Sequence, residues 1–351
     1  MTRKVKWGII GAGGIARRRT LPAIGEVSNA EIIGIMDKSK EALEEMAKEY
    51  NIPYVYENEE DLINNPEIEA IYIASPVGFH KEQARKVIAS GKHILLEKPI
   101  GLDLEESKEI VTLAKNADIK AGAALVMRFH DGHQKMRDLV QEGKLGQIVS
   151  ARAQLTCWFP KMENNWRQNI KTAGGGSLLD MGIHCIDLLR YILADEVEEV
   201  CGFIDNKIFD YEVEDSATII MKMKKGVVCT IDNYFNIPDE AAKCLFEIYG
   251  TKGSIIATRT IGQDGGGAIE LVLSGDDKGY QSQQERENAT DDAKLDFEKC
   301  NMYARQIESF SDAILKDKQP EISLMEAYKD MEVIEYSYLS AKQKKVLKIG
   351  Q

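Results

Sequence analysis

The sequence lacks the features that mark several large classes of protein. Its six cysteines form no C-x-x-C pair and follow no metal-ligand spacing, so we expect free thiols, a reducing compartment and no metal site. It has no long uncharged apolar run, so neither a signal peptide nor a membrane span is expected. Basic charge is also scarce: 45 Lys and Arg face 57 Asp and Glu, and the net charge of −12 disfavours nucleic-acid binding. These absences predict a cytoplasmic protein whose partners are small molecules, not nucleic acids or membranes.

The length predicts two domains, since 351 residues exceed the roughly 100 to 200 residues of one ordinary domain. Up to residue 124, short β-branched runs alternate with longer amphipathic runs, which is typical of βαβ units and a parallel sheet. We therefore expect a doubly wound α/β domain at residues 1–124 and a second domain at residues 125–351. The predicted strands of the first domain are 5–10, 30–36, 70–73, 93–96 and 120–124, and its predicted helices are 15–24, 40–50, 79–90 and 104–116.

Beyond residue 125 the pattern changes to strand-like runs separated by turn residues. This indicates an α+β domain with a large, mostly antiparallel sheet. The terminal segment of the second domain either stays with that sheet or packs back on the first domain. The polar stretch 276–296 has no helical stripe and is expected to be an exposed loop. The predicted helices are 133–142, 177–193, 297–314 and 324–341, and the predicted strands are 147–156, 197–204, 216–223, 227–231, 243–248, 254–257, 268–273 and 346–349.

A glycine-rich turn lies between the first predicted strand and the first predicted helix. Gly11 allows a tight turn, Gly13 lets the backbone approach a pyrophosphate, and Ala16 permits close packing of the helix. Free N–H groups at the start of the helix would face the phosphates. This context predicts a dinucleotide site built on the run Gly11-Ala12-Gly13-Gly14-Ile15-Ala16.

Asp37 ends the second predicted strand. A carboxylate there can accept hydrogen bonds from both ribose hydroxyls of NAD, and it would repel the 2′-phosphate of NADP. The alternative is that Asp37 only caps the following helix. We favour NAD as the cofactor, while NADP stays open because of the nearby cations Arg17, Arg18, Arg19 and Lys38.

Lys98 follows the strand 93–96 directly and so lies at a carboxyl-end sheet edge, where open α/β sheets bind ligands. Its amine can hydrogen-bond a substrate hydroxyl, and a cationic nicotinamide nearby would make it a better proton acceptor. The alternative is a surface lysine paired with Glu97.

Asp180, His184 and Asp187 are spaced by four and three residues in the predicted helix 177–193, so all three are expected on one face. His184 can exchange a proton with a hydroxyl, and Asp180 can orient His184 or hold a sugar. The alternatives are a buried structural network and a metal site. No other His or Cys cluster completes a metal shell, so we expect no metal.

Four motifs, in order and over essentially the whole chain, resemble the Gfo/Idh/MocA family, named after glucose-fructose oxidoreductase, inositol dehydrogenase and a rhizopine catabolism protein. The resemblance implies an N-terminal Rossmann domain and a C-terminal domain whose open sheet forms homodimers or homotetramers. It also implies NAD(P)-dependent oxidation or reduction of sugars and polyols. The motifs are the glycine-rich turn, Ala74-Ser75-Pro76 to His80, Gly91-Lys92-His93 to Glu97-Lys98-Pro99, and Asp180 to Asp187.

The resemblance also implies roles for particular residues. Lys98 and His184 would handle the alcohol proton while C4 of nicotinamide takes or gives hydride, and Asp180 would bind the reacting hydroxyl or tune His184. Trp166 and Arg167 resemble a pair that flanks cofactor and substrate, with simple packing as the alternative. The implied cofactor site adds Ser75, Pro76, His80 and Glu97, and the implied substrate site adds Arg128 and Tyr303, whose alternative is domain-interface packing.

An intact Lys98, Asp180 and His184 trio predicts an active dehydrogenase acting on a secondary hydroxyl or ketone of a sugar, cyclitol or glycoside. Three alternatives stay open: a glycoside C3 dehydrogenase that recycles tightly bound NAD, a reductase of imines or biliverdin, and a non-catalytic NAD(H) sensor. Substrate choice is expected to depend on the second-domain sheet and on loops such as 157–171.

Overall fold

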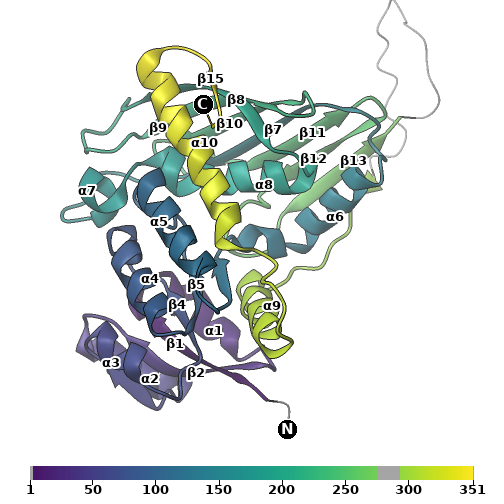
Figure 1. Ribbon diagram of the computed structural model, residues 1–351. Helices are drawn as coiled ribbons and strands as arrows, with labels where there is room; N and C mark the ends of the chain where they lie inside the picture. Colours follow the sequence, from purple (N-terminus) through teal and green to yellow (C-terminus); the bar gives the residue numbers. More distant parts are fainter. Residues whose placement is uncertain (1–2, 275–292, 351) are drawn as a thin grey trace, which may run out of the picture.

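The first domain is built on one parallel sheet (Figure 1). The computed structural model describes residues 3–274 and 293–350. The strands are β1 (Val5–Ile10), β2 (Ala30–Met36), β3 (Tyr54–Tyr56), β4 (Ala70–Ile73), β5 (His93–Leu96) and β6 (Ala121–Ala123). They follow the order β3-β2-β1-β4-β5-β6, and all five pairings are parallel, as expected when helical connections join successive strands. The predicted doubly wound sheet is confirmed.

The helices of this domain form where apolar residues recur at helical spacing and a polar side chain caps the start. In α2 (Lys40–Tyr50), Leu43 and Met46 are fully buried, and the cap residue Ser39 accepts a hydrogen bond from the backbone of Ala42. The other helices are α1 (Leu21–Ile24), α3 (Glu59–Asn64), α4 (His80–Ala89) and α5 (Leu104–Lys115), with short helical segments at Ala12–Thr20 and Val77–Phe79.

The strand order reverses between β1 and β4, and a crevice for ligands opens at such a point beyond the carboxyl ends of the strands. Gly11 follows β1 directly, and Ser75 is the second residue after β4. A Cβ atom on Gly11 would lie 2.4 Å from the backbone nitrogen of Ser75, and the φ angle of Gly11 is +83°. Glycine is therefore required where the two loops meet.

The second domain is a nine-stranded sheet in the order β14-β13-β12-β11-β7-β10-β9-β8-β15. All of its pairings are antiparallel except that of β7 with β10. The predicted mostly antiparallel sheet is confirmed. The strands are β7 (Ile148–Thr156), β8 (Val197–Asp205), β9 (Ser216–Met223), β10 (Val228–Tyr234), β11 (Leu245–Gly250), β12 (Gly253–Thr258), β13 (Ala268–Leu273), β14 (Ala293–Lys294) and β15 (Leu347–Lys348).

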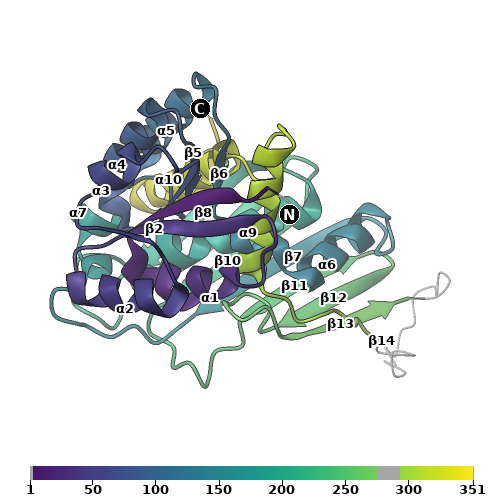
Figure 2. The same ribbon diagram turned by 90° about the horizontal axis from the view of Figure 1, so that it is seen from below.

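Helices cover one face of this sheet and leave the other open (Figures 1 and 2). Along β10, Cys229 and Ile231 are fully buried toward the helices, whereas Val228 on the opposite face is 45% exposed. Ile220 on β9 and Tyr249 on β11 are exposed on the same face. The helices are α6 (Asp131–Gln141), α7 (Ile170–Ala173), α8 (Ile183–Leu193), α9 (Met302–Leu315) and α10 (Leu324–Gln343), with short helical segments at Val126–Phe129, Trp166–Gln168 and Leu178–Gly182.

The last two helices join the domains. α9 packs on the first sheet, where the indole Nε1 of Trp7 donates to Ser311 Oγ at 3.0 Å and the Trp7 and Phe310 rings lie 5.5 Å apart. α10 contacts α5 and β6 of the first domain as well as α8 and β8 of the second, and Figure 1 shows it running between them. The two domains therefore share a continuous apolar core.

The predicted elements differ from the structure in several places. The first helical segment starts at Ala12 instead of residue 15, because the chain coils directly out of the Gly11 turn. The helix expected from residue 297 starts at Met302, where Asn301 caps it. β3 was missed because it has only three residues, and α3 because it is short and largely polar. Most of the loop predicted at 276–296 lies outside the described residues.

A buried ion network lies where the two domains and α10 meet. Nε and Nη2 of Arg128 donate to the carboxylate of Asp187, with the Nε–Oδ1 contact at 2.9 Å, and Nη2 also donates to Glu326 at 3.0 Å. The side chains of Arg128 and Asp187 are 8% and 1% exposed. Charged side chains this deeply buried are stable only when they are paired with each other.

Asp187→Ala is expected to lower the free energy of unfolding by about 3 kcal/mol, because the buried Arg128 guanidinium would lose its closest partner. Urea denaturation measures the change. The control Asp210→Ala removes the partner of Lys161 in an exposed pair and should leave the midpoint unchanged. Equal midpoints for Asp187→Ala and the wild type would contradict the proposed role of the network.

Candidate active site

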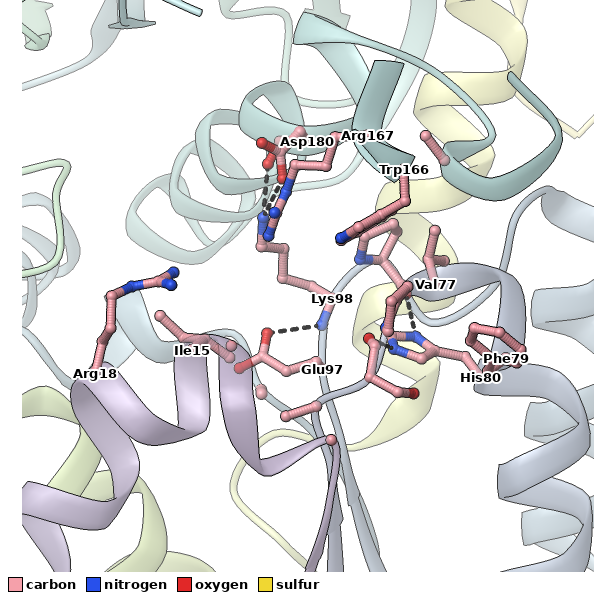
Figure 3. Close-up of a pocket in the computed structure, with 18 of the residues that line it drawn as sticks. Ile15, Arg18, Val77, Phe79, His80, Glu97, Lys98, Trp166, Arg167 and Asp180 are labelled. Carbon is pink, nitrogen blue, oxygen red and sulfur yellow. Dashed lines mark hydrogen bonds and ion pairs between the residues drawn. The ribbon is translucent and has the colours of Figure 1, made fainter. Parts of the chain in front are cut away.

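A cavity of about 740 Å³ opens at the carboxyl ends of the first sheet, between the two domains. Its floor is the turn after β1 and the loops after β2, β4 and β5, and the second domain supplies the facing wall (Figure 3). Among the predicted site residues, those that line it are Gly11, Gly13, Gly14, Ile15, Asp37, Ser75, Pro76, His80, Glu97, Lys98, Trp166, Arg167, Asp180, His184 and Tyr303. Their individual roles stay predictions.

Two predicted site residues do not line the cavity. Ala16 is fully buried beneath the turn, where its small side chain permits the close packing that the sequence predicts. Arg128 is engaged by Asp187 and Glu326, so the expectation that Arg128 binds substrate is corrected: the buried carboxylates hold it in the domain interface. Asp187 points to Arg128 and does not line the cavity with Asp180 and His184. The prediction that all three side chains lie on one helix face is therefore wrong.

The turn after β1 and the end of β2 form a cradle suited to a dinucleotide. The backbone N–H of Gly13 donates to Asp37 Oδ2 at 2.8 Å, and that of Lys38 donates to Asp37 Oδ1 at 2.7 Å. A Cβ atom on Gly13 would lie only 3.0 Å from Asp37 Oδ2. The carboxylate is thus fixed beside the glycine turn, and its remaining lone pairs can accept ribose hydroxyls.

The cations near this cradle have different partners. Arg17 pairs with Glu45, and Arg19 donates to Gln263. Arg18 lines the cavity, and so does Lys38, whose ammonium lies 5.0 Å from the centre of the Phe79 ring. Two of the four cations therefore line the cavity, and one of them, Lys38, directly follows Asp37.

His80 joins the loops after β4 and β5. Its Nε2 lies 2.8 Å from the carbonyl oxygen of Ser75, and its Nδ1 lies 2.9 Å from that of Pro99. Burial lowers the pKa of His80, although both carbonyls oppose that effect. His80 thus fixes the spacing between the Ser75 loop and the Lys98 loop.

Lys98 reaches across the domain interface to Asp180. Its Nζ donates to the backbone oxygen of Asp180 at 2.7 Å and to Asp180 Oδ1 at 3.0 Å, and Figure 3 shows Lys98 and Arg167 both pointing toward Asp180. Behind Lys98, the Glu97 carboxyl accepts from the Tyr72 hydroxyl and from the Lys98 backbone. Burial raises the pKa of Glu97.

The protonation states at this junction follow from burial and charge. Burial alone would raise the pKa of Asp180, but Lys98 and Arg167 lower it to about 2. Burial, assisted by the Lys98 charge, lowers the pKa of His184 to about 3 against the opposing effect of Asp180. The site therefore presents a carboxylate and a neutral imidazole at neutral pH, and the buried Nδ1 of His184 has no hydrogen-bond partner among the described residues.

Glu214 holds the helix that carries Asp180 and His184, and the sequence analysis missed it. Its carboxylate accepts from the backbone N–H groups of Gly176 at 2.8 Å and Leu178 at 2.9 Å, and from the Tyr338 hydroxyl at 2.8 Å. The two backbone donors are free N–H groups at the start of a helix, and a carboxylate satisfies such groups. Glu214 lies 38 residues beyond Gly176, so no local motif announces the contact.

Further lining residues missed by the sequence analysis are mainly apolar: Phe79, Met181 and Phe235, together with the polar Glu59, Gln83 and Gln263. Phe235 lies directly after β10, and the parallel pairing of β10 with β7 places it next to the residues that follow β7. Within the described ranges, no group of three or more His, Cys, Asp or Glu side chains could hold a metal ion. None of the helices described here is long and apolar enough to cross a membrane.

Each of the two domains matches a known protein family. Residues 5–124 match the model described as an oxidoreductase family with an NAD-binding Rossmann fold, and residues 133–256 match the GFO/IDH/MocA C-terminal domain. The chain is 30% identical to the 1,5-anhydro-D-fructose reductase of Ensifer adhaerens over 316 residues, which cover 90% of each chain. The sequence similarity therefore includes both of the domains that line the cavity.

Solved structures share the fold at lower identity. The aldose-aldose oxidoreductase of Caulobacter crescentus, complexed with glycerol, superposes with a TM-score of 0.88 at 23% identity over 99% of this chain and 100% of that one. A levoglucosan dehydrogenase in complex with NADH and levoglucosan has a TM-score of 0.86 at 22% identity, over 99% and 100% of the two chains.

Acidification should destabilise the protein through His184. In the unfolded chain this side chain gains a proton near its ordinary pKa of 6.5, whereas in the fold it stays neutral down to about 3. Its contribution to stability is therefore complete above pH 6.5 and declines as the pH falls toward 3, by up to about 1.4 kcal/mol per pH unit. Urea denaturation between pH 7 and pH 4.5 should show a shallower loss for His184→Gln than for the wild type. Parallel curves would contradict the buried neutral imidazole.

Proposed function

The chain belongs to the Gfo/Idh/MocA family of oxidoreductases, and we propose that it is a dehydrogenase that transfers hydride between a nicotinamide cofactor and a secondary hydroxyl or ketone of a sugar, cyclitol or glycoside. The observation that carries the proposal is the contact of Lys98 with Asp180 beside His184. This contact brings three proton-handling groups from two domains to one cavity wall, opposite the glycine turn that would hold the cofactor.

Each of the three side chains has a distinct part in the chemistry. Nicotinamide, when bound, supplies the hydride acceptor or donor at its C4 atom. The Asp180 carboxylate keeps the Lys98 ammonium at the cavity wall and can accept a hydrogen bond from a substrate hydroxyl. His184 is neutral and can accept the proton that leaves the hydroxyl, while Lys98 can stabilise the alkoxide. Microscopic reversibility lets the same groups serve reduction.

The cofactor that we propose is NAD. Support comes from the carboxylate of Asp37, which is fixed by the backbones of Gly13 and Lys38 where a 2′-phosphate would lie. Lys38 directly follows Asp37 and lines the cavity, as does Arg18, and these cations favour an anion. The Asp37 carboxylate contacts the glycine turn directly, and like charges in direct contact cost several kcal/mol.

The proposed activity is tested by NADH absorbance near 340 nm with NAD and a panel of free sugars, inositols and glycosides. Lys98→Ala and His184→Ala should each lower kcat by about 100-fold or more while NADH binding persists. NADP should give a kcat/KM at least tenfold lower than NAD, and Asp37→Ser should narrow that gap.

Several outcomes would redirect the proposal. Bound cofactor without turnover of any substrate, in either direction, would indicate a sensor. Reduction of imines or biliverdin with NADH, and of no sugar-derived ketone, would indicate a reductase of those compounds. Turnover without added NAD would indicate recycling of a tightly bound cofactor, as in a glycoside C3 dehydrogenase.

We further propose that the chain works in the cytoplasm as a homodimer or homotetramer joined through the open face of the second sheet. Supporting features are the six free cysteines and the exposed apolar side chains of Ile220, Val228 and Tyr249 on that face. Sedimentation equilibrium should show two or four copies. A monomer at micromolar concentration would contradict the assembly.

A further inference from the structure

The second domain presents an apolar wall to the cavity. Leu155, Cys157 and Phe159 alternate along the chain at the end of β7, so their side chains share the face that points into the cavity. Between them, Trp158 points to the opposite face, where it is 45% exposed and packs against Phe209. We call the side chains of Leu155, Cys157, Phe159, Met181 and Phe235 the apolar wall.

The parallel pairing of β7 with β10 holds this wall in place. Backbone contacts continue beyond β7: Cys157 donates to Tyr234 at 2.9 Å, and Phe159 donates to Phe235 at 2.8 Å beside an isolated antiparallel bridge between Trp158 and Asn236. The Phe159 and Phe235 rings lie 5.0 Å apart. Met181, on the helix that carries Asp180 and His184, packs in the same apolar cluster. The wall is therefore a fixed part of the fold next to the proton-handling groups.

Hydrogen-bonding side chains are scarce on this side of the cavity. Among the described lining residues from the second domain, Arg167, Asp180 and His184 bring polar groups to the Lys98 end, Trp166 adds one indole N–H, and there is no Ser, Thr or Asn. Two further polar residues belong to the cofactor side: Gln263 accepts from Arg19, and Tyr303 interacts with Glu97 and the arginines after the glycine turn. A substrate hydroxyl placed against Leu155, Phe159 or Phe235 would thus lose its hydrogen bonds to water and gain none from these side chains.

From this polarity we propose, on the basis of the dehydrogenase function above, that the substrate is an amphipathic cyclic polyol or its ketone. Its reacting end carries hydroxyls that meet Lys98, Asp180 and His184. Its far side is apolar, as a deoxy carbon or an alkyl or aryl aglycone, and lies against the apolar wall.

A fully hydroxylated sugar with one ring face stacked on Phe159 is the competing interpretation, because aromatic side chains also pack on C–H groups. The wall includes Leu155, Cys157 and Met181, which offer no ring for stacking. The two interpretations differ in whether removing a hydroxyl, or adding an apolar aglycone, improves binding.

Matched pairs of ligands test the proposal: methyl and phenyl glycosides of one sugar, and a sugar with its 6-deoxy analogue. Calorimetric titration of the protein–NADH complex measures binding whether or not turnover occurs, and kcat/KM with NAD is measured beside it. We expect the more apolar member of a pair to bind about 10- to 100-fold more tightly. Equal binding of the members, tighter binding of the more hydroxylated ones, or binding of none would overturn the proposal.

Substitutions in and beside the apolar wall test whether the wall causes the tighter binding of apolar ligands. Phe159→Gln should reduce the preference for the apolar ligand to less than about threefold, and the nearly isosteric Cys157→Ser should reduce it partly, while both keep NADH affinity as the test of folding. The matched control Trp158→Gln changes the neighbouring side chain that points away, so it should keep the preference. An unchanged preference in Phe159→Gln would overturn the wall as its cause. Tighter binding of apolar ligands without any turnover would instead support the wall and refute the dehydrogenase.

Discussion

The ion pair of Lys98 and Asp180 is the interaction on which the rest of the site depends. It joins the loop after β5 of the first domain to the helix that precedes α8 of the second, with 3.0 Å between the charged atoms. Lys98 keeps Asp180 ionised, and burial together with the Lys98 charge disfavours a charged His184. Domain contact and proton chemistry therefore have one physical cause: two opposite charges that share a partly dry cavity.

Contacts on both sides keep this pair in position. Glu214 and Tyr338 anchor the start of the helix that carries Asp180, and His80 ties the Lys98 loop to the Ser75 loop. The buried Arg128 and Asp187 pair and the helices α9 and α10 hold the domains together around the cavity. A site built this way needs little reorganisation when ligands arrive, which is the condition for electrostatic catalysis.

The sequence predicted the features that depend on local order and failed where distant residues decide. The glycine turn, Asp37, Lys98 and the Asp180–His184 spacing lie on single elements, so pattern alone places them at one cavity. Arg128 was wrongly placed because its partners, Asp187 and Glu326, lie 59 and 198 residues away. Glu214 and Phe235 were missed for the same reason: each reaches the site through tertiary packing, without a motif of its own.

The most direct test of the central claim is a crystal structure of the chain with NADH and a substrate found by the activity screen. The account predicts that the reacting hydroxyl lies within hydrogen-bond distance of Lys98 or His184, with the nicotinamide on the side of the glycine turn and the substrate's apolar part against Leu155 and Phe159. A reacting hydroxyl that contacts none of Lys98, Asp180 and His184 would contradict it.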